Sequence, residues 1–444
     1  MRKTAARAML LAAVWVMAET SSAGQKTKPP VDHGPERLRM VVLLSRHGVR
    51  SPTWTEDRLD SYSVLPWPKW SVPPGDLTSR GYELVKQFAS YDRASLAGAG
   101  LLAASGCEDA AKTYIWADTD QRTMASGKAL AEGFFSGCPL QVHGLAAGVS
   151  DPLFHPAANG VKPVEADAAF AELSRRAQQQ KNAQQDELIQ EVQHVLLGCD
   201  PKIACTPVHA PQMLLQPSPA DSGDVAVRGK GDHRVDLQGP LPLASTFAED
   251  FLLEYTEGMA MDQVGWGKVD EAQLRRFLQL HSDYFDLMHH TPMLARLEAS
   301  NLLLHIAHTL QQAAERKPVN DAIGPVGAML VVLAGHDTNI AGVAALLGVH
   351  WDLDGRHDDT PPGTELGFEL WQDARGVYSV RVTIAVQTLQ QMREMQALTP
   401  AAPPAHATLT VQGCKAIRGA CQLADFSQLV GRATRAAAGS AIKN

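Results

Sequence analysis

The sequence predicts an α/β fold in which a mixed central sheet is flanked by helices and a second, mostly α-helical domain is inserted. Three patterns support this prediction. Residues 40–44 and 329–334 are short apolar runs rich in branched side chains, as expected for strands that are buried on both faces. Residues 54–300 instead show mostly helical periodicity. Residues 368–371 and 378–386 alternate in the manner of late antiparallel strands.

The composition is that of a folded globular protein. Of the 444 residues, 45% are hydrophobic and 20% are charged, which suits one large domain or two ordinary ones. The formal net charge is −8 at pH 7, and a generally acidic surface repels nucleic acid and anionic lipid. We therefore expect no nucleic-acid partner, and any anion site should be a local basic pocket. We also expect a monomer.

The N-terminus has the pattern of a cleavable signal peptide over residues 1–23. Basic residues precede the apolar run at 8–18, and small residues then allow cleavage near Ala23. The run is too short to serve well as a membrane span, so we expect no membrane contact after cleavage. Removing this segment brings the formal net charge to about −10. The mature protein is expected in the periplasm or the medium.

The first predicted strand ends in a cluster of groups that suit phosphate chemistry. Arg46, His47 and Arg50 follow it within a few residues, and Gly48 allows a tight change of direction. Strand ends in open α/β sheets are common ligand sites. Each guanidinium can bind two phosphoryl oxygens, and a neutral imidazole is a competent nucleophile. The alternative interpretation is a strand followed by a basic surface turn.

Helices joined by loops are expected through the middle of the chain. Residues 54–74 form a loop, and Thr78 or Ser79 caps a helix that runs to about residue 102. A strand at 112–117 leads past Arg122, which taken alone is a surface charge, into a helix at 124–135. The remaining expectations are helices at 166–197, 243–258 and 270–314, and a loop at 198–242.

A second buried strand, at residues 329–334, also ends in reactive groups. His336 and Asp337 follow it directly, and a helix is expected from residue 340 to residue 347. A lone His-Asp pair is common and means little. Beside His47, however, it supplies what phosphoryl transfer needs, because Asp337 can protonate the departing alkoxide and His336 can add a donor to the phosphate.

The segment Arg46-His47-Gly48-Val49-Arg50-Ser51-Pro52 resembles the Arg-His-Gly-x-Arg-x-Pro signature of the histidine acid phosphatases, in particular their bacterial periplasmic acid phosphatases and phytases. The Arg-His-Gly core is shared with phosphoglycerate mutases, which carry no aspartate at the place of Asp337. The resemblance implies a phosphoglycerate-mutase-like sheet domain, a small-molecule phosphomonoester substrate and no cofactor. It also implies catalytic roles for His47 and Asp337. The phosphate-binding residues that it implies are Arg46, Arg50, Thr53, Arg122 and His336.

Three further residues are candidates for the substrate pocket. Trp54 stands where some phytate-cleaving relatives carry a basic residue. Thr246 and Glu249 lie at the start of the helix expected at 243–258 and face the pocket from the helical domain. The preferred ester, whether phytate or a sugar phosphate, does not follow from these residues. A phosphate-binding protein without turnover and a phosphotransferase of the mutase type remain alternative functions.

Six cysteines are consistent with export. Their spacing suggests three local disulfides, although about 15 pairings are possible in principle. The suggested pairs are Cys107 with Cys138, Cys199 with Cys205, and Cys414 with Cys421. An oxidising compartment favours disulfides, and no Cys-x-x-Cys spacing supports the competing metal interpretation.

We expect no metal site. The histidines of the helical middle were weighed as ligands and are interpreted as structural, because none has a carboxylate at zinc-protease spacing; they are His281, His289, His290, His305 and His308. The domain prediction assigns residues 24–53, 111–150 and 320–444 to the catalytic α/β domain. Residues 54–110 and 151–319 are assigned to the helical domain that covers the substrate.

Overall fold

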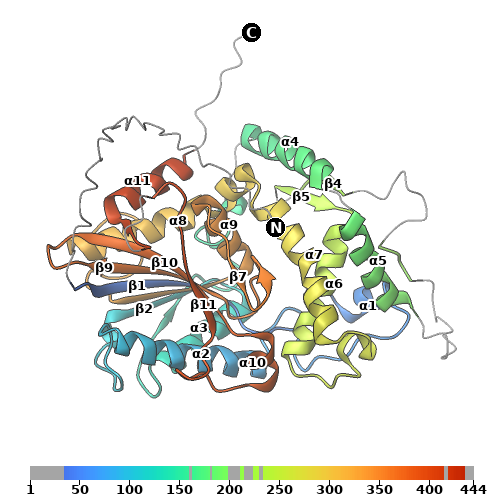
Figure 1. Cartoon of the computed structure of the whole chain (residues 1–444), viewed down its shortest axis with the longest axis horizontal. Helices are drawn as coiled ribbons and strands as arrows, with labels where there is room; N and C mark the ends of the chain where they lie inside the picture. Colours follow the sequence, from blue (N-terminus) through green and yellow to red (C-terminus); the bar gives the residue numbers. More distant parts are fainter. Residues whose placement is uncertain are drawn as a thin grey trace, which may run out of the picture.

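A computed structural model of the chain shows a sheet with helices on both faces and a group of helices beside it (Figure 1). The structure describes residues 35–159, 163–180, 183–198, 211–214, 224–229, 234–414 and 419–435. The predicted signal peptide and the Cys199–Cys205 pair lie outside these residues. In the described part, no helix combines the length and the apolar character that crossing a bilayer requires.

The central sheet contains eight strands within the described residues, in the order β11-β10-β9-β1-β6-β2-β3, with β12 paired to β10. β1 is parallel to β6, and β2 is parallel to β6 and β3, whereas β9, β10 and β11 run antiparallel to their neighbours. The predicted mixed sheet is therefore confirmed. Its strands are β1 (Arg37–Arg46), β2 (Thr113–Ala117), β3 (Val142–His143), β6 (Leu330–Gly335), β9 (Glu365–Gln372), β10 (Tyr378–Val386), β11 (Ala405–Leu409) and β12 (Cys421–Gln422).

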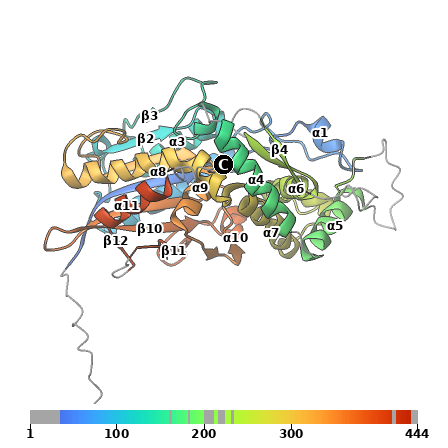
Figure 2. The same ribbon diagram turned by 90° about the horizontal axis from the view of Figure 1, so that it is seen from above.

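Helices cover both faces of this sheet. α2 and α3 pack on one face, in a core that joins Val85 of α2 to Val41 of β1. α8, α9 and α11 pack on the other face, where Leu303 of α8 shares a core with Val331 of β6. Figure 2 shows α8 and α11 lying over the strands when the molecule is seen from above. These helices are α2 (Ser79–Gly98), α3 (Gln121–Phe134), α8 (Pro292–Glu315), α9 (Asp337–Leu347) and α11 (Leu423–Ala433).

The remaining helices form a separate core beside the sheet (Figure 1). Its fully buried aromatic side chains include Phe251 of α6 and Phe277 of α7, with Leu173 of α4 and Val192 of α5 packed around them. The members are α1 (Glu56–Asp60), α4 (Pro163–Gln180), α5 (Ala183–Leu197), α6 (Pro240–Thr256), α7 (Glu271–His289) and the short α10 (Leu389–Glu394). Two small hairpins complete the structure: β4 (Val225–Arg228) with β5 (Val235–Gln238), and β7 (Asp352–Leu353) with β8 (Arg356–His357).

The structure differs from the sequence-based expectations in several places. α2 and α8 were assigned to the helical domain, but their apolar faces pack on the sheet. The single helix expected at 166–197 is two helices, α4 and α5. The helix expected at 270–314 breaks between α7 and α8, because Pro292 cannot continue the hydrogen-bond pattern of α7. Short elements that lie within expected loops, α1 and the β4–β5 hairpin, were not predicted.

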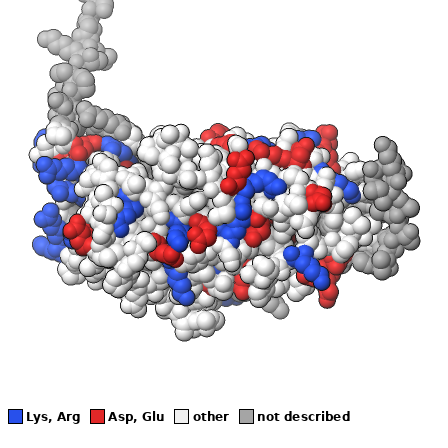
Figure 3. All heavy atoms as spheres, turned by 90° about the horizontal axis from the view of Figure 1, so that it is seen from below, with Lys and Arg blue, Asp and Glu red and all other residues white. Residues whose placement is uncertain are grey.

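Two of the predicted disulfides are present. Cys107 is bonded to Cys138, which ties the segment before β2 to the segment after α3. Cys414 is bonded to Cys421 of β12. On the face seen in Figure 3, basic and acidic side chains are scattered among uncharged ones, apart from a small basic group at the left edge. That face therefore offers no broad basic field to attract a polyanion.

Candidate active site

Three parallel strands end side by side, and each is followed by a chemically active residue. His47 follows β1, His336 follows β6 and Asp118 follows β2. Backbone hydrogen bonds hold the three strand ends in line with one another. His47 N–H donates to Gly335 O at 3.0 Å, and Asp118 N–H donates to Ala334 O at 3.0 Å. The carboxyl ends of neighbouring parallel strands thus bring together residues that are far apart in the sequence.

His47 is buried, with 2% of its surface exposed. Its Nδ1 lies 2.8 Å from Gly48 O. Because a carbonyl oxygen can only accept, Nδ1 carries the proton and the lone pair of the neutral ring is on Nε2. Burial and the neighbouring guanidiniums, that of Arg122 first, hold the pKa of His47 well below its usual value. The lowered pKa favours the neutral, nucleophilic form of the imidazole.

Gly48 serves close packing and not an unusual turn, which corrects the sequence-based interpretation. The glycines with positive φ do not include it among the described residues. A Cβ at Gly48 would instead lie 2.6 Å from Gly81 O on α2, and a Cβ at Gly81 would lie 2.1 Å from Val49 O. The backbone after His47 therefore rests directly on the first turn of α2, a contact that only glycine permits at both positions.

Arg46 and Arg50 meet a carboxylate from the helical group. Glu249 of α6 binds both, since its Oε1 accepts from Arg46 and its Oε2 lies 2.9 Å from Arg50 Nη2. The Arg46 side chain is fully buried, and it also donates to Thr360 O. Burial alone would raise the pKa of Glu249, but the two guanidiniums lower it, so Glu249 is ionised. It holds the two arginines together as a pair.

Asp337 is the first residue of α9 and lies beside the same arginine. Its Oδ2 is 2.7 Å from Arg46 Nη2, and its Oδ1 accepts from Thr338 N–H at 2.8 Å. Although burial alone would raise the pKa of Asp337, the Arg46 charge lowers it below the usual range. The carboxyl group is thus ionised in the unliganded site, close to His47 and its arginines.

Arg122, the second residue of α3, reaches the site from the other side. Its Nη2 lies 3.4 Å from His336 Nδ1 and 2.6 Å from Asp120 Oδ2. The rings of His47 and His336 are 5.7 Å apart between centroids. The structure therefore brings Arg46, His47, Arg50, Arg122, His336 and Asp337 together, as the sequence suggested.

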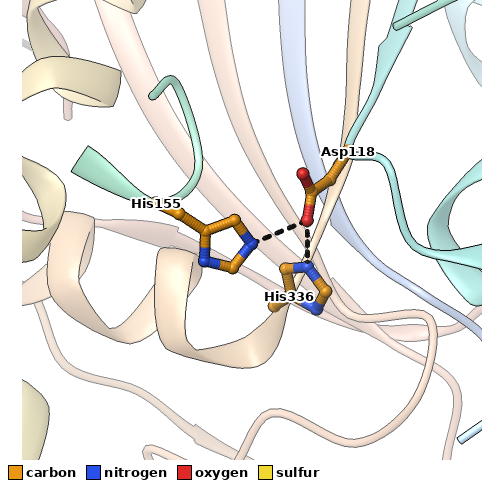
Figure 4. A group of neighbouring side chains, drawn as sticks. All are labelled: Asp118, His155 and His336. Atoms are coloured by element: carbon orange, nitrogen blue, oxygen red, sulfur yellow. Dashed lines mark hydrogen bonds and ion pairs between the residues drawn. The ribbon is translucent and has the colours of Figure 1, made fainter. Parts of the chain in front are cut away.

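The support of His336 was missed in the sequence. Its Nε2 donates to Asp118 Oδ2 at 2.6 Å, and His155 Nε2 donates to the same oxygen at 2.8 Å (Figure 4). Asp118 is buried; burial would raise its pKa, but the two imidazoles lower it. The carboxylate thereby fixes the orientation of His336. Burial lowers the pKa of His336 below its usual value, and the hydrogen bond to Asp118 opposes this shift only in part. Asp118 could have been found, since it follows its strand as His47 and His336 follow theirs. His155 lies in a turn bounded by Pro152 and Pro156, but nothing in that turn indicated a contact with Asp118.

A large cavity on the helical side includes two of the predicted pocket residues, Trp54 and Thr246, whereas Glu249 and the arginines of the site are not among its lining residues. Its volume is about 890 Å³, and its lining includes Trp54, Thr246 and Tyr284. Arg58 also lines it and stacks on the Trp54 ring, 3.5 Å from the ring centroid. Thr53 is exposed, and a Cβ at Gly75 would lie within 4 Å of both Thr53 and Arg122. Thr53 therefore stands at the rim of the site.

His281 of α7 was interpreted as structural but lies in the site. One of its ring nitrogens is within 4.8 Å of carboxylate oxygens of Glu249 and Asp337, and its Nδ1 is 3.0 Å from Ser245 Oγ. It is buried, and with Ser245 and Glu249 of α6 it forms the side of the site that the helical group supplies. Sequence periodicity does not say which face of α7 meets the sheet, so this residue carried no signal.

A buried imidazole surrounded by guanidiniums at the ends of parallel strands is suited to binding a phosphate ester. The chain belongs to the histidine phosphatase superfamily (branch 2), whose sequence profile matches residues 37–385. It is 35% identical to the phytase AppA of Escherichia coli (strain K12) over 407 residues, or 89% of this chain and 92% of the relative. It is 28% identical to the glucose-1-phosphatase of Salmonella typhimurium over 442 residues, or 97% and 100%.

Solved structures agree with this assignment. The phytase from Citrobacter braakii has a TM-score of 0.77 and 32% identity, covering 90% of this chain and 98% of that one. The Hafnia alvei phytase in complex with tartrate has a TM-score of 0.76 and 34% identity over the same shares. The protein is accordingly a histidine-type acid phosphatase, a phosphoric monoester hydrolase.

Proposed function

We propose that this phosphatase is an exported enzyme that hydrolyses phosphomonoesters through a phosphohistidine on His47, with Asp337 as the general acid. The observation that carries the proposal is the hydrogen bond from His47 Nδ1 to Gly48 O, which leaves the Nε2 lone pair available beside Arg46 and Arg50. The arginines, with Arg122 and His336, would neutralise the phosphoryl oxygens in the transition state.

In the first step His47 Nε2 attacks phosphorus, and the bond from phosphorus to the ester oxygen breaks. The leaving oxygen keeps the electron pair and takes a proton from Asp337. In the second step water attacks phosphorus, the P–N bond breaks, and Asp337 accepts the proton. Asp337 must therefore be protonated when the ester is bound. A phosphate dianion that shares Arg46 would weaken the ion pair from Arg46 to Asp337 and so raise the pKa of Asp337 from its low value.

The phosphomonoester that the enzyme prefers has to be argued separately from the reaction. The relatives are named as phytases and glucose-1-phosphatases, and a related Hafnia alvei structure is a complex with myo-inositol hexakis sulphate. In this chain Trp54 lines the cavity, and the charged residues among the described lining are Arg58 and Asp236. One cation balanced by one carboxylate favours esters with a single phosphate, such as sugar phosphates, over the highly charged phytate.

A phosphate-binding protein and a mutase-like phosphotransferase are the alternatives. A binding protein needs neither the nucleophile nor the acid, and a mutase returns the phosphoryl group to a hydroxyl instead of water. Rapid acid quench with a labelled phosphomonoester distinguishes these outcomes, because our mechanism predicts label on His47 and its release as inorganic phosphate. Label on Ser45 or Ser51, transfer to an alcohol in place of water, or turnover by His47→Ala at the native rate would contradict the mechanism.

The substrate and the location need two further measurements. Values of kcat/KM for phytate, glucose 1-phosphate and a nitrophenyl ester at acidic pH would rank the candidates, and a preference for phytate would contradict the single-phosphate inference. Export rests on the sequence of residues 1–23. Deleting that segment should retain the protein in the cytoplasm, as cell fractionation would show, with the full-length chain as the control.

A further inference from the structure

A second group of histidines and carboxylates lies outside the active site. It contains His290, directly after α7; His350, shortly after α9; and Asp358, directly after β8. We propose that these three residues bind a divalent transition-metal ion of the zinc type, which ties the end of α7 to the β7–β8 hairpin. This inference is independent of the proposed mechanism.

The geometry of the three side chains is close to that of a metal site. One ligand atom from each lies within 4.8 Å of the other two. His350 Nδ1 and Asp358 Oδ2 are 2.6 Å apart, and the His290 and His350 ring centroids are separated by 5.6 Å. Ligands bound to tetrahedral zinc at ~2.0–2.1 Å lie ~3.4 Å from one another. Metal binding thus requires these atoms to shift by about 1.5 Å at most, which side-chain rotation provides.

The residues around the group hold it in place and offer a further ligand. Asp358 has a left-handed backbone (φ 46°), and its Oδ1 accepts from Trp351 N–H at 2.8 Å. His290 Nδ1 lies 3.6 Å from Asp286 Oδ1, the kind of carboxylate that orients a metal-binding imidazole. His357 Nε2 is 3.4 Å from Asp358 Oδ2, within reach of the fourth position.

Ligand chemistry and access decide the class of ion. Two or three imidazoles with one carboxylate suit zinc, copper or nickel, whereas calcium and magnesium prefer a shell made of oxygen ligands. The His350 and His357 side chains are 51% and 64% exposed, so an ion can enter from solvent. The ligands come from three separate segments, so the spacing of residues near His290 in the sequence contains no signal for the site.

The position of the group suggests what the ion would do. His290 ends the helix that carries His281 into the active site, and Ser282 Oγ of the same helix donates to His357 O at 2.8 Å. Asp358 precedes Thr360 by two residues, and the Thr360 carbonyl accepts from Arg46. A bound ion would therefore join α7 to the segment that supports Arg46, and we expect it to stabilise the fold without taking part in the chemistry.

The test is isothermal titration of the untagged full chain with zinc chloride at pH 7, after a chelator has removed bound metal. Neutral pH is needed because the imidazoles must be deprotonated to bind. One zinc ion should bind per chain and raise the thermal midpoint. His350→Ala and Asp358→Asn should each weaken binding by ~10-fold or more, since even outer-shell changes cost that much. His406→Ala, which removes an exposed histidine on β11, is the matched control and should bind as the native chain does.

Two other groups are competing locations, because their potential ligand atoms also lie within 4.8 Å of one another: Asp118 with His155 and His336, and Glu249 with His281 and Asp337. His155→Asn removes a ligand of the first group and His281→Asn removes a ligand of the second, and each should leave zinc binding unchanged. Crystals soaked in zinc should show an anomalous peak between His290, His350 and Asp358. Unchanged affinity in a folded His350→Ala variant, a peak only at Asp118, or no zinc binding by the native chain would overturn the proposal. Should Asp358→Asn fail to fold, the exposed His350 position still supplies the test.

Discussion

Replacing Asp337 by asparagine tests the assignment of the proton donor. The amide keeps the shape and can accept from Thr338 N–H, but it cannot give a proton to the leaving oxygen. Arg46, which lies 2.7 Å from Asp337, retains Glu249 and Thr360 O as partners, so the buried guanidinium is not left unpaired. We therefore expect the variant to fold with its other phosphate-binding groups in place.

The magnitude follows from what general acid catalysis supplies. Esters with poor leaving groups, such as sugar phosphates, should be phosphorylated on the enzyme ~100-fold more slowly or worse. That factor corresponds to ~2.7 kcal/mol of activation free energy. A nitrophenyl ester should lose much less, because its phenolate departs without a proton. Asp425→Asn, an exposed change in α11, controls for the effect of a substitution as such.

The pH dependence of kcat and kcat/KM tests the role of Asp337 independently, because the direction of the expected shift can be stated. In the unliganded enzyme the pKa of Asp337 is lowered, so its protonated fraction keeps rising as the pH falls through the acidic range. The quantity kcat/KM reports the free enzyme, and kcat reports the complex, in which bound phosphate shares Arg46. The limb due to Asp337 should therefore lie at higher pH in kcat than in kcat/KM, and both limbs should vanish in Asp337→Asn.

The assay must follow phosphorylation directly by burst kinetics, because Asp337 also serves as the base in the second step. Comparing the pH profiles of native and variant enzyme on the same ester cancels the effect of the substrate's own ionisation. Equal slowing of phosphorylation for both ester types would refute the reasoning, since it would mean that Asp337 holds the site together and does not donate a proton. An unchanged pH profile in the variant would refute it as well.

Two other substitutions test the surroundings of the catalytic groups. His155→Asn should raise the pKa of His336, because it removes a charge that lowers this pKa and leaves the Asp118 oxygen to His336 alone; an NMR titration in which the His336 midpoint stays or falls would contradict this. Gly48→Ala should lower the free energy of unfolding by ~1–3 kcal/mol, as overpacking does, and also lower kcat/KM, because its Cβ would meet Gly81 O at 2.6 Å. Urea denaturation measures the free energy of unfolding. An unchanged value in Gly48→Ala would contradict the prediction, because it would mean that α2 can move away from the new Cβ without loss of stability.

Much of the sheet could be predicted because its strands are strongly patterned. The run expected at 329–334 is β6, shifted by one residue, and the alternation at 378–386 is β10. The boundaries between helices were harder. Proline is favoured at the first position of a helix, so Pro292 indicates a helix start. The apolar periodicity continues on both sides of it, however, and this continuity predicts a single helix. The strands of the β4–β5 hairpin have four residues each, too few to show a period.

The active-site residues also fall into two classes, those that the sequence could predict and those that it could not. Residues at strand ends, such as His47 and His336, could be proposed because a buried run followed by a polar cluster marks a sheet edge. Residues supplied by helix faces were proposed only from their place in an expected helix, as Glu249 was, or not at all, as with His281. Which face of α6 or α7 meets the sheet depends on packing between distant segments, and helical periodicity does not contain that information.

The position of β6 between β1 and β2 constrains how the chain can fold. β1 and β2 each pair with β6 and not with one another, so the parallel part of the sheet lacks its middle strand until residue 335 has been made. A nascent chain that stops earlier leaves both edges of β1 and one edge of β2 without partners, because β9 is missing as well, and leaves the first turn of α9 unformed. Folding is thereby postponed to late in synthesis, and the export that we propose would have this requirement, because a chain crosses a membrane unfolded before its disulfides form.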